Sequence, residues 1–385
     1  MRTLVLACLL LVAAASSRAA VITVDAGGGG DHMTVADGIA AASPGDTVQI
    51  ETGIYSEYGL VLKPNMALRS VTGDPASVTI DGGNYDEILR CENAGDVRIE
   101  GLRILHGRSE HGAMYADSTS LTLTGCVFES NASYLPTGGG AFRFENSTAV
   151  VTDCLLKANY GGGAGFTNCP DVSITATTFF KNTGGGIRCD NAIVELTDSV
   201  LDDNCCASNV TLVNGSDATL TGCVVYKGAT AEGGGISADA SSFSLTGCSV
   251  VRNIGSEGVG LFLKNGSTGE VENTIIAFSV DGNAVTVDGT STINLTCTDI
   301  YGNEGGDWTG SVAGQAGISG NLSSNPLFCS TETSLLELAA ASPCLPAGNS
   351  CGVIIGARGM GCAGADVPEA KTLDATWSTI KSLYR

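Results

Sequence analysis

The densest group of side chains with acid–base or anion-binding chemistry lies between residues 103 and 111. It combines His106 and His111 with Arg103 and Arg108. Imidazole transfers protons near neutral pH, and guanidinium groups bind carboxylates, so this cluster could hold an acidic sugar. No set of carboxylates at a catalytic spacing accompanies it, and a polar loop is the competing interpretation.

Asp202 and Asp203 form a second candidate. Paired carboxylates can cleave glycosidic bonds when one activates water and the other protonates the leaving oxygen. The pair directly precedes Asn204, which belongs to a repeating series of asparagines, so a solvated turn is the competing interpretation. We therefore expect no catalytic, cofactor-binding or metal-ligating residue. Calcium stays open as a cofactor, because it could bridge an acidic protein and a polyuronate.

The composition favours sheets and turns over helices. The 385 residues include 53 glycines, and only 15% of the chain is charged. Glycine disfavours helix interiors and suits turns. The 19 basic and 40 acidic residues give a formal net charge of −21. Such a charge excludes nucleic acid and anionic membrane surfaces as good partners.

A repeat of 22 to 28 residues organises the middle of the chain. We anchor it on nine positions, three residues after an aliphatic side chain and two residues before another apolar one. The anchors are Leu102, Cys126, Cys154, Thr177, Ser199, Cys223, Cys248, Thr274 and Thr298. Short strands at this period, with the same residue types stacking, predict an all-β, single-stranded parallel β-helix of about 11–12 coils with about three short strands per coil. The flanking apolar columns should face inward.

Corners are expected at two kinds of position. The residue before each anchor must absorb a bend, because the inward alternation shifts there; it is Gly, Asp, Ala, Asn or Cys. Five residues after the anchor an asparagine recurs, as at Asn131, Asn159 and Asn182. We expect this asparagine to adopt the left-handed conformation and to bond the equivalent residue one coil away.

Both ends of the chain differ from the repeats. Residues 1–19 read as a cleaved signal peptide, which places the protein outside the cell or on its surface, and no apolar stretch long enough for an integral membrane span follows. Residues 33–42 predict an N-terminal capping helix. The β-helix should extend over 20–324 and end in a cap over 325–362, with Leu335, Leu336, Leu338, Ile354 and Ile355 covering the last coil. Residues 363–385 form a linker and a candidate sorting or anchoring tail.

The cysteines fall into two groups. Cys126, Cys154, Cys223 and Cys248 share the inward anchor column and should be small core residues. Another four lie in the irregular C-terminal segment and should form two disulfides, in one of three pairings. These are Cys329, Cys344, Cys351 and Cys362.

Several motifs resemble a known family. The stretch from Ala36 to Leu68 resembles the first coil of secreted right-handed parallel β-helix proteins of the pectin-lyase-like superfamily. Gly139-Gly140-Ala141 and the Phe-x-x-Asn motifs at 128–131 and 179–182 are similar to the repeats of polymorphic outer-membrane protein passengers. The resemblance implies right-handed coiling over about residues 21–362 and an extracellular or cell-surface location, but it transfers no activity.

The predicted function is therefore an exported, non-catalytic β-helix module that recognises glycans or other surface components. Two alternatives stay open: a polysaccharide lyase or hydrolase acting on one flank, and a structural spacer without a ligand. The Gly-His-Gly and Arg-x-Lys elements expected of polygalacturonase-like hydrolases do not occur in the sequence.

Overall fold

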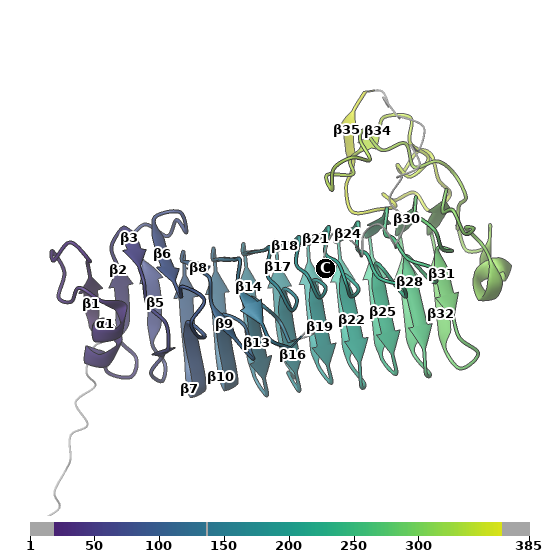
Figure 1. The fold of residues 1–385 in the computed structure, drawn as a ribbon. Coiled ribbons are helices and arrows are strands. Elements are labelled where there is room, and N and C mark those ends of the chain that lie inside the picture. The colour runs from purple at the N-terminus through teal and green to yellow at the C-terminus, as the bar shows by residue number, and fades with distance from the viewer. Residues whose placement is uncertain (1–18, 136–137, 364–385) are drawn as a thin grey trace, which may run out of the picture.

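The computed structural model describes residues 19–135 and 138–363, most of which form a rod of stacked coils (Figure 1). Nearly all of the predicted signal peptide and tail lies outside these residues. Each typical coil contributes three short strands, here called row 1, row 2 and row 3 in chain order. The strand pairs between coils are parallel and in register, apart from one register shift between β7 and β10, so the predicted parallel β-helix is confirmed.

Rows 1 and 2 together form a twenty-stranded sheet, since β7 and β10 each run through both rows. Row 1 consists of β4 (Leu60–Val61), β7 (Leu89–Glu100), β10 (Met114–Thr124), β13 (Phe142–Glu145), β16 (Ala164–Thr167), β19 (Ile187–Asp190), β22 (Val210–Val213), β25 (Ile236–Asp239), β28 (Leu261–Lys264) and β31 (Val285–Val287). Row 2 adds β1 (Val21–Val24), β2 (Thr47–Ile50), β5 (Ala67–Ser70), β14 (Thr148–Thr152), β17 (Asp171–Thr175), β20 (Ile193–Thr197), β23 (Asp217–Thr221), β26 (Ser242–Thr246), β29 (Thr268–Glu272) and β32 (Thr292–Thr296).

Row 3 is a separate eleven-stranded sheet. Its strands are β3 (Gly53–Tyr55), β6 (Val78–Asp81), β8 (Arg103–Leu105), β11 (Val127–Glu129), β15 (Leu155–Lys157), β18 (Thr178–Phe180), β21 (Val200–Asp202), β24 (Val224–Tyr226), β27 (Ser249–Val251), β30 (Ile275–Ala277) and β33 (Asp299–Tyr301). Two small pairs complete the sheets: β9 (Arg108–Ser109) with β12 (Ala132–Ser133), and β34 (Leu338–Ala339) with β35 (Met360–Cys362).

The predicted inward columns form the core. All nine anchors are at most 3% exposed, including the four cysteines assigned to this column. In row 3 the apolar residues two positions after the anchors pair in register from Ile104 through Phe128, Leu156 and Phe179 to Ile300. Stacking identical positions gives each buried side chain a neighbour of similar shape above and below, which supports close packing.

Left-handed residues make the corners. The residue before each of the nine anchors has φ between 48° and 63°, as the shift of the inward alternation predicts. The asparagine that recurs five residues after the anchor does not adopt the left-handed conformation that we expected. There the left-handed residue is the one before it, such as Ser130, Ala158 or Lys181, so a residue of almost any type makes this corner.

The asparagines themselves form a buried hydrogen-bonded ladder. Asn182 accepts from the Nδ2 of Asn159 at 2.9 Å and from its backbone N at 3.0 Å. Its own Nδ2 donates to the Leu156 carbonyl at 2.9 Å and to the Oδ1 of Asn204 at 2.9 Å. Every polar atom of this fully buried side chain is thus satisfied, which removes the penalty of burying an amide.

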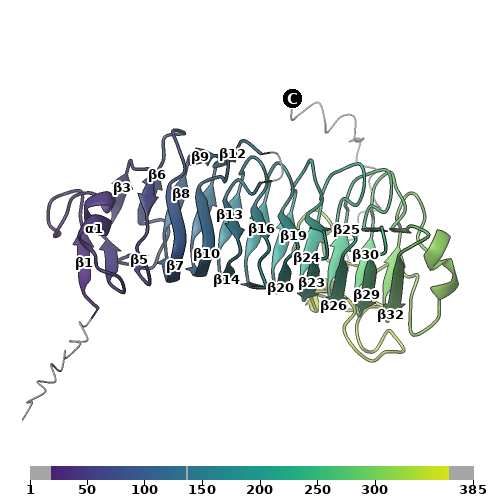
Figure 2. The same ribbon diagram turned by 90° about the horizontal axis from the view of Figure 1, so that it is seen from below.

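Different elements cover the two ends of the rod (Figure 2). Helix α1 (Val35–Ala41) covers the first coil, as predicted; Thr34 caps it, and the carboxylate of Glu57 accepts from its first two N–H groups. At the other end the short 3-10 helix η1 (Gly310–Gln315) places Val312 in the main core, and Trp308 packs against it. The expectation that residues 325–362 close this end is therefore wrong.

Residues 325–362 fold back along the side of the rod and pack on row 3 (Figure 1). Phe328, Leu336, Leu338, Cys344 and Ile355 are buried there against outward-facing residues of three row 3 strands. These are Val224 and Tyr226 of β24, Val251 of β27, and Ile275 and Ala277 of β30. Leu335 and Ile354, also expected in the cap, are 67% and 41% exposed. The side face binds the segment because its outward positions are apolar in these coils.

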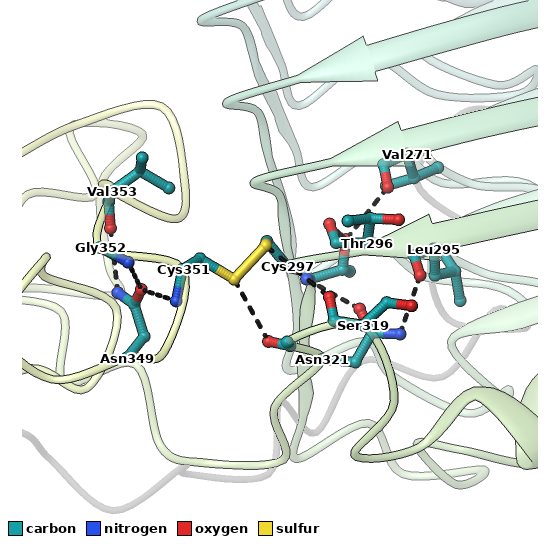
Figure 3. Close-up of a disulfide and its surroundings, with 12 residues drawn as sticks. Val271, Leu295, Thr296, Cys297, Ser319, Asn321, Asn349, Cys351, Gly352 and Val353 are labelled. Atoms are coloured by element: carbon teal, nitrogen blue, oxygen red, sulfur yellow. Dashed lines mark hydrogen bonds between the residues drawn. A yellow bond between two sulfur atoms is a disulfide. The ribbon is translucent and has the colours of Figure 1, made fainter.

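Two disulfides hold this segment, as predicted, but one pairing partner differs from the expectation. Cys329 pairs with Cys362, whereas Cys351 pairs with Cys297, the corner residue before the last anchor (Figure 3). Cys344 is buried and takes no part in a disulfide. Asn349 shapes the turn before the bond by accepting from the N–H groups of Cys351 and Gly352 at 3.1 and 2.9 Å. The Cys297–Cys351 bond therefore links the segment covalently to the rod.

Replacing Asn182 by alanine should lower the stability of the protein by about 2–4 kcal/mol, because buried partners in two neighbouring coils lose their hydrogen bonds. The shift of the urea midpoint measures this loss. Asn294→Ala is the control, since the Asn294 side chain is exposed and bonds only Glu270 among the described residues; it should change stability by less than about 0.5 kcal/mol. Equal effects would contradict a stabilising role of the ladder.

Cys351→Ser should release the C-terminal segment before the coils unfold. A disulfide in loops of this size contributes about 2–4 kcal/mol, and here the loss falls on the contacts between the segment and row 3. Limited proteolysis should cleave within 325–362 while the β-sheet circular dichroism signal persists. Protection equal to that of the wild type would show that apolar packing alone holds the segment.

Burial raises the pKa of Asp299 to about 6, although hydrogen bonds from Ser324 N and the Cys344 thiol oppose this rise. The folded protein then binds a proton at Asp299 more tightly than the unfolded chain, so the contribution of Asp299 to stability is largest below about pH 4 and is lost as the pH rises through about 6. The Asp299→Asn variant has no carboxyl group to titrate here. Its stability relative to that of the wild type should therefore rise by about 2–3 kcal/mol between pH 4 and pH 6. Parallel stability curves over pH 4–7 would refute the assignment.

Candidate functional site

The structure separates the basic cluster that the sequence suggested. Its four members each contact a different partner, and the contacts do not converge on one point. The pairs are Arg103 with Glu129 at 2.7 Å, His106 Nδ1 with Asp81 at 3.0 Å, Arg108 over the ring of Tyr134 at 5.5 Å, and His111 Nδ1 with Glu87 at 3.7 Å. The cluster therefore forms no single acid–base site.

Asp202 and Asp203 lie far from that cluster. Asp203 occupies the same corner position as His106, but four coils along the rod, or about 19 Å at 4.8 Å per coil. Burial raises the pKa of both carboxyl groups, and the lysines at 181 and 227 partly offset this rise. Ser334 of the C-terminal segment bonds Asp202, so this carboxyl group serves the contact between the segment and row 3.

The structure instead assembles a basic and aromatic column on the outer surface of row 1. Strand register places Arg90, Tyr115, Arg143, Gly165 and Arg188 side by side in five consecutive coils. All belong to strands whose neighbouring residues point into the core. The column therefore presents three guanidinium groups and a phenol along one line of the surface. We call it the arginine column.

A column of mainly acidic residues runs beside it, two positions further along the same strands. It comprises Glu92, Asp117, Glu145, Thr167 and Asp190. The two columns pair within strands: Arg90 Nη1 lies 2.6 Å from Glu92, Arg143 Nε 2.7 Å from Glu145, and Arg188 Nη2 3.6 Å from Asp190. The surface thus alternates donors and acceptors and is nearly balanced in charge.

Gly165 opens a gap in the arginine column. Because it has no side chain, Arg143 and Arg188 flank a depression of about 150 Å³ whose lining includes Gly138, Thr167 and Asp190. A Cβ atom at position 165 would approach the Gly138 carbonyl oxygen to 3.0 Å. The depression therefore depends on glycine, and its walls are polar.

Aromatic and acidic groups border the first coils of the column. The His111 ring stacks on Tyr115 with 4.1 Å between centroids, and Arg90 also lies over the Tyr115 ring, 5.3 Å from its centroid. Burial, and then the nearby Glu145, raise the pKa of Tyr115 to about 12. Burial would raise the pKa of Glu87, but bonds from His111 and Arg90 outweigh it and lower this pKa. Tyr115 is thus a protonated phenol and Glu87 a carboxylate at neutral pH.

Three further tyrosines stand exposed in the loops that lead into row 1. Tyr85, Tyr134 and Tyr160 are 74%, 58% and 58% exposed. They precede β7, β13 and β16, the strands that carry the arginine column or its glycine. Exposed aromatic rings beside polar groups are typical of surfaces that bind amphipathic ligands.

The sequence contains a pattern for this site that the grouping of basic residues by density does not reveal. The members of the arginine column stand 11 or 12 residues before successive anchors, at Leu102, Cys126, Cys154, Thr177 and Ser199. The density of basic residues around 103–111 points to one coil, whereas the site is built from one residue in each of five coils. Within residues 19–135 and 138–363 there is no group of three or more His, Cys, Asp or Glu side chains that could hold a metal ion.

Comparisons with known proteins agree with this architecture. Residues 87–250 match the family described as the right-handed β-helix region. The pectate lyase Pel9A superposes with a TM-score of 0.52 at 12% identity, covering 90% of this chain and 97% of that one. This chain is a right-handed parallel β-helix with the pectin-lyase-like fold. At such low identity the likeness concerns the fold alone.

Two other proteins are similar to parts of this chain. The surface adhesin PfbA of Streptococcus pneumoniae has a TM-score of 0.40 at 10% identity, covering 70% of this chain and 86% of that chain. A metabotropic glutamate receptor-like protein R of Dictyostelium discoideum is 26% identical over 174 residues, which are 40% of this β-helix chain but 11% of the receptor-like protein. The match thus spans a small part of that relative.

Two observations bear on location. Among the helices of the described residues, none is long and apolar enough to cross a membrane. The two disulfides fit a protein outside the cytoplasm, where thiols can be oxidised.

Proposed function

We propose that this β-helix is an exported, non-catalytic module that binds a hydroxyl-rich, uncharged glycan along the arginine column. The observation that carries the proposal is the in-register line from Arg90 to Arg188 beside its acidic column. Sugar hydroxyls both donate and accept hydrogen bonds, and a surface of alternating guanidinium and carboxylate groups offers both kinds of partner. The apolar faces of sugar rings can pack on the rings of Tyr115 and the exposed tyrosines.

The charge balance favours a neutral glycan over a polyuronate. Each arginine of the column already lies beside a carboxylate, so little positive charge remains for an anionic polymer. The whole chain carries a formal net charge of −21, which adds long-range repulsion. Calcium would have to bridge the two before a polyuronate could bind well.

The length of the column suits an extended ligand. Five coils at about 4.8 Å per step give a line of about 19 Å. The depression at Gly165 lies near one end of this line and the stacked His111 and Tyr115 rings near the other. An oligosaccharide laid parallel to the rod axis could contact both.

The side-chain chemistry supports binding more than turnover. Elimination or hydrolysis needs a base near the reacting atom, and a phenol with a pKa of about 12 is a poor base at neutral pH. Glu87 and His111, which also border the column, contact each other, and Glu87 bonds Arg90 as well. His106 and Asp203 stand at corners four coils apart. A polysaccharide lyase or hydrolase is therefore the second candidate function, and a spacer without a ligand is the third.

Export is part of the same proposal. The proposed signal peptide over residues 1–19 and the two disulfides both support a secreted or cell-surface location. Within the chain we propose the β-helix over 20–324, the cysteine-containing segment over 325–362, and a linker with a sorting or anchoring tail over 363–385.

Tyr115→Ala and Arg188→Ala should each weaken glycan binding about tenfold, which corresponds to roughly 1.4 kcal/mol. Binding is measured on a panel of neutral and acidic polysaccharides, with and without calcium. Arg103→Ala is the matched control, because Arg103 also pairs with a glutamate in a strand, but on row 3; it should bind like the wild type. Equal losses in all three variants would contradict the site.

The same panel separates the three candidate functions. Reversible binding without product supports the binding module. Product formation that Asp203→Ala or His106→Ala abolishes would establish an enzyme and overturn the proposal. Absence of both binding and turnover across the panel would favour the spacer.

A further inference from the structure

Two adjacent cysteines lie at the corner between β21 and β22. The Sγ atoms of Cys205 and Cys206 are 2.8 Å apart, whereas a disulfide bond measures about 2.05 Å. Cys205 is 4% exposed, and Cys206 is exposed to solvent. One sulfur thus faces the small apolar cluster of Ala229, Ile254 and Val280, and the other is accessible to reagents.

Neighbouring coils hold the backbone of this pair on both sides. Cys205 N donates to the Asn182 carbonyl at 3.0 Å, and Cys206 N donates to the Ala229 carbonyl at 2.8 Å. The Cys205 carbonyl accepts from Gly184 N at 2.7 Å and from Gly185 N at 3.0 Å. The two thiols are therefore kept close by the β-helix itself.

The conformation of Cys206 is unusual for its residue type. Its φ is +72°, in the left-handed region, where a Cβ atom crowds the following carbonyl oxygen. Backbone strain of this kind persists where the surroundings enforce it, and it often marks functional positions. Here it brings two consecutive side chains to the same side of the chain, an arrangement that adjacent residues of an extended strand cannot adopt.

We propose that Cys205 and Cys206 form a reversible vicinal disulfide, made by exchange with a small-molecule disulfide. The Cys206 thiolate attacks one sulfur of that oxidant and expels the first thiolate, leaving a mixed disulfide on Cys206. The Cys205 thiolate then attacks the Cys206 sulfur and expels the second. The two thiols lose two protons and two electrons in total, and the oxidant is reduced to two thiols.

The surroundings determine the order of these steps. The contact with Cys206, together with burial, raises the pKa of Cys205, so Cys205 is the weaker nucleophile toward an external reagent. Among the residues that the structure describes, eight other thiols outside the two disulfides are buried: those of Cys91, Cys126, Cys154, Cys169, Cys189, Cys223, Cys248 and Cys344. Cys206 is thus the sulfur that an oxidant in solution reaches first.

Mass spectrometry after treatment of the folded protein with oxidised glutathione tests the proposal. Trypsin releases residues 189–227 as one peptide, which holds Cys189, Cys205, Cys206 and Cys223. Alkylation after denaturation should modify only Cys189 and Cys223 in the oxidised protein and all four cysteines after reduction. Four alkylated cysteines in the treated protein, or a persistent glutathione adduct on Cys206, would overturn the proposal.

Two variants identify the second step. Cys205→Ser should retain glutathione on Cys206, since the resolving thiol is missing. Cys223→Ser, a buried thiol in the same tryptic peptide, is the matched control and should still form the vicinal disulfide. Loss of the 205–206 bond in Cys223→Ser, or no glutathione retained on Cys206 in Cys205→Ser, would contradict the assignment. The wild-type experiment decides the question by itself if either variant fails to fold.

Discussion

The strands of each coil in this protein pair with the equivalent strands of the coil before it and the coil after it, in parallel and in register apart from one shift between β7 and β10. A residue in one coil therefore meets the equivalent residues of its two neighbours. This constraint converts a feature of a single coil into a line along the rod. It produces the apolar columns of the core, the asparagine ladder at the corner and the arginine column on row 1. The same rule makes a polar residue inside the rod tolerable, because the next coil supplies its partner.

The sequence repeat predicted the core well because the positions that recur as apolar in each repeat are also the buried positions of each coil. The apolar residues on either side of each anchor are fixed by the pleat, and the bend before the anchor follows from their shifted alternation. The role of the recurring asparagine was predicted only in part. Its amide ladder was expected, but the left-handed corner belongs to the preceding residue, where Ser, Ala, Lys and Asp all occur. Residue type at that corner carries little information, since the closed coil imposes the conformation.

The C-terminal segment shows what periodicity within the coils does not reveal. Its place depends on outward residues of row 3, which change from mixed and charged, as at Arg103 and Glu129, to apolar, as at Val224 and Ile275. Disulfide pairing was equally hidden, because Cys297 belongs to the repeats and Cys351 to the segment that folds back on them. The candidate site was missed for a related reason. Its residues are spread over five coils, one per coil, and only the register brings Arg90 into line with Arg188.

The side chain of Gln315 affects whether separate molecules can associate end to end. Its side chain accepts from Leu295 N at 2.8 Å and donates to the Ile293 carbonyl at 3.0 Å, so it occupies hydrogen-bonding groups that another strand would otherwise use. An uncovered last coil would offer a template on which a second rod could add end to end, as strands add to a growing fibril. By using backbone groups of β32 itself, one glutamine amide helps the protein to remain a particle of fixed length instead of a filament.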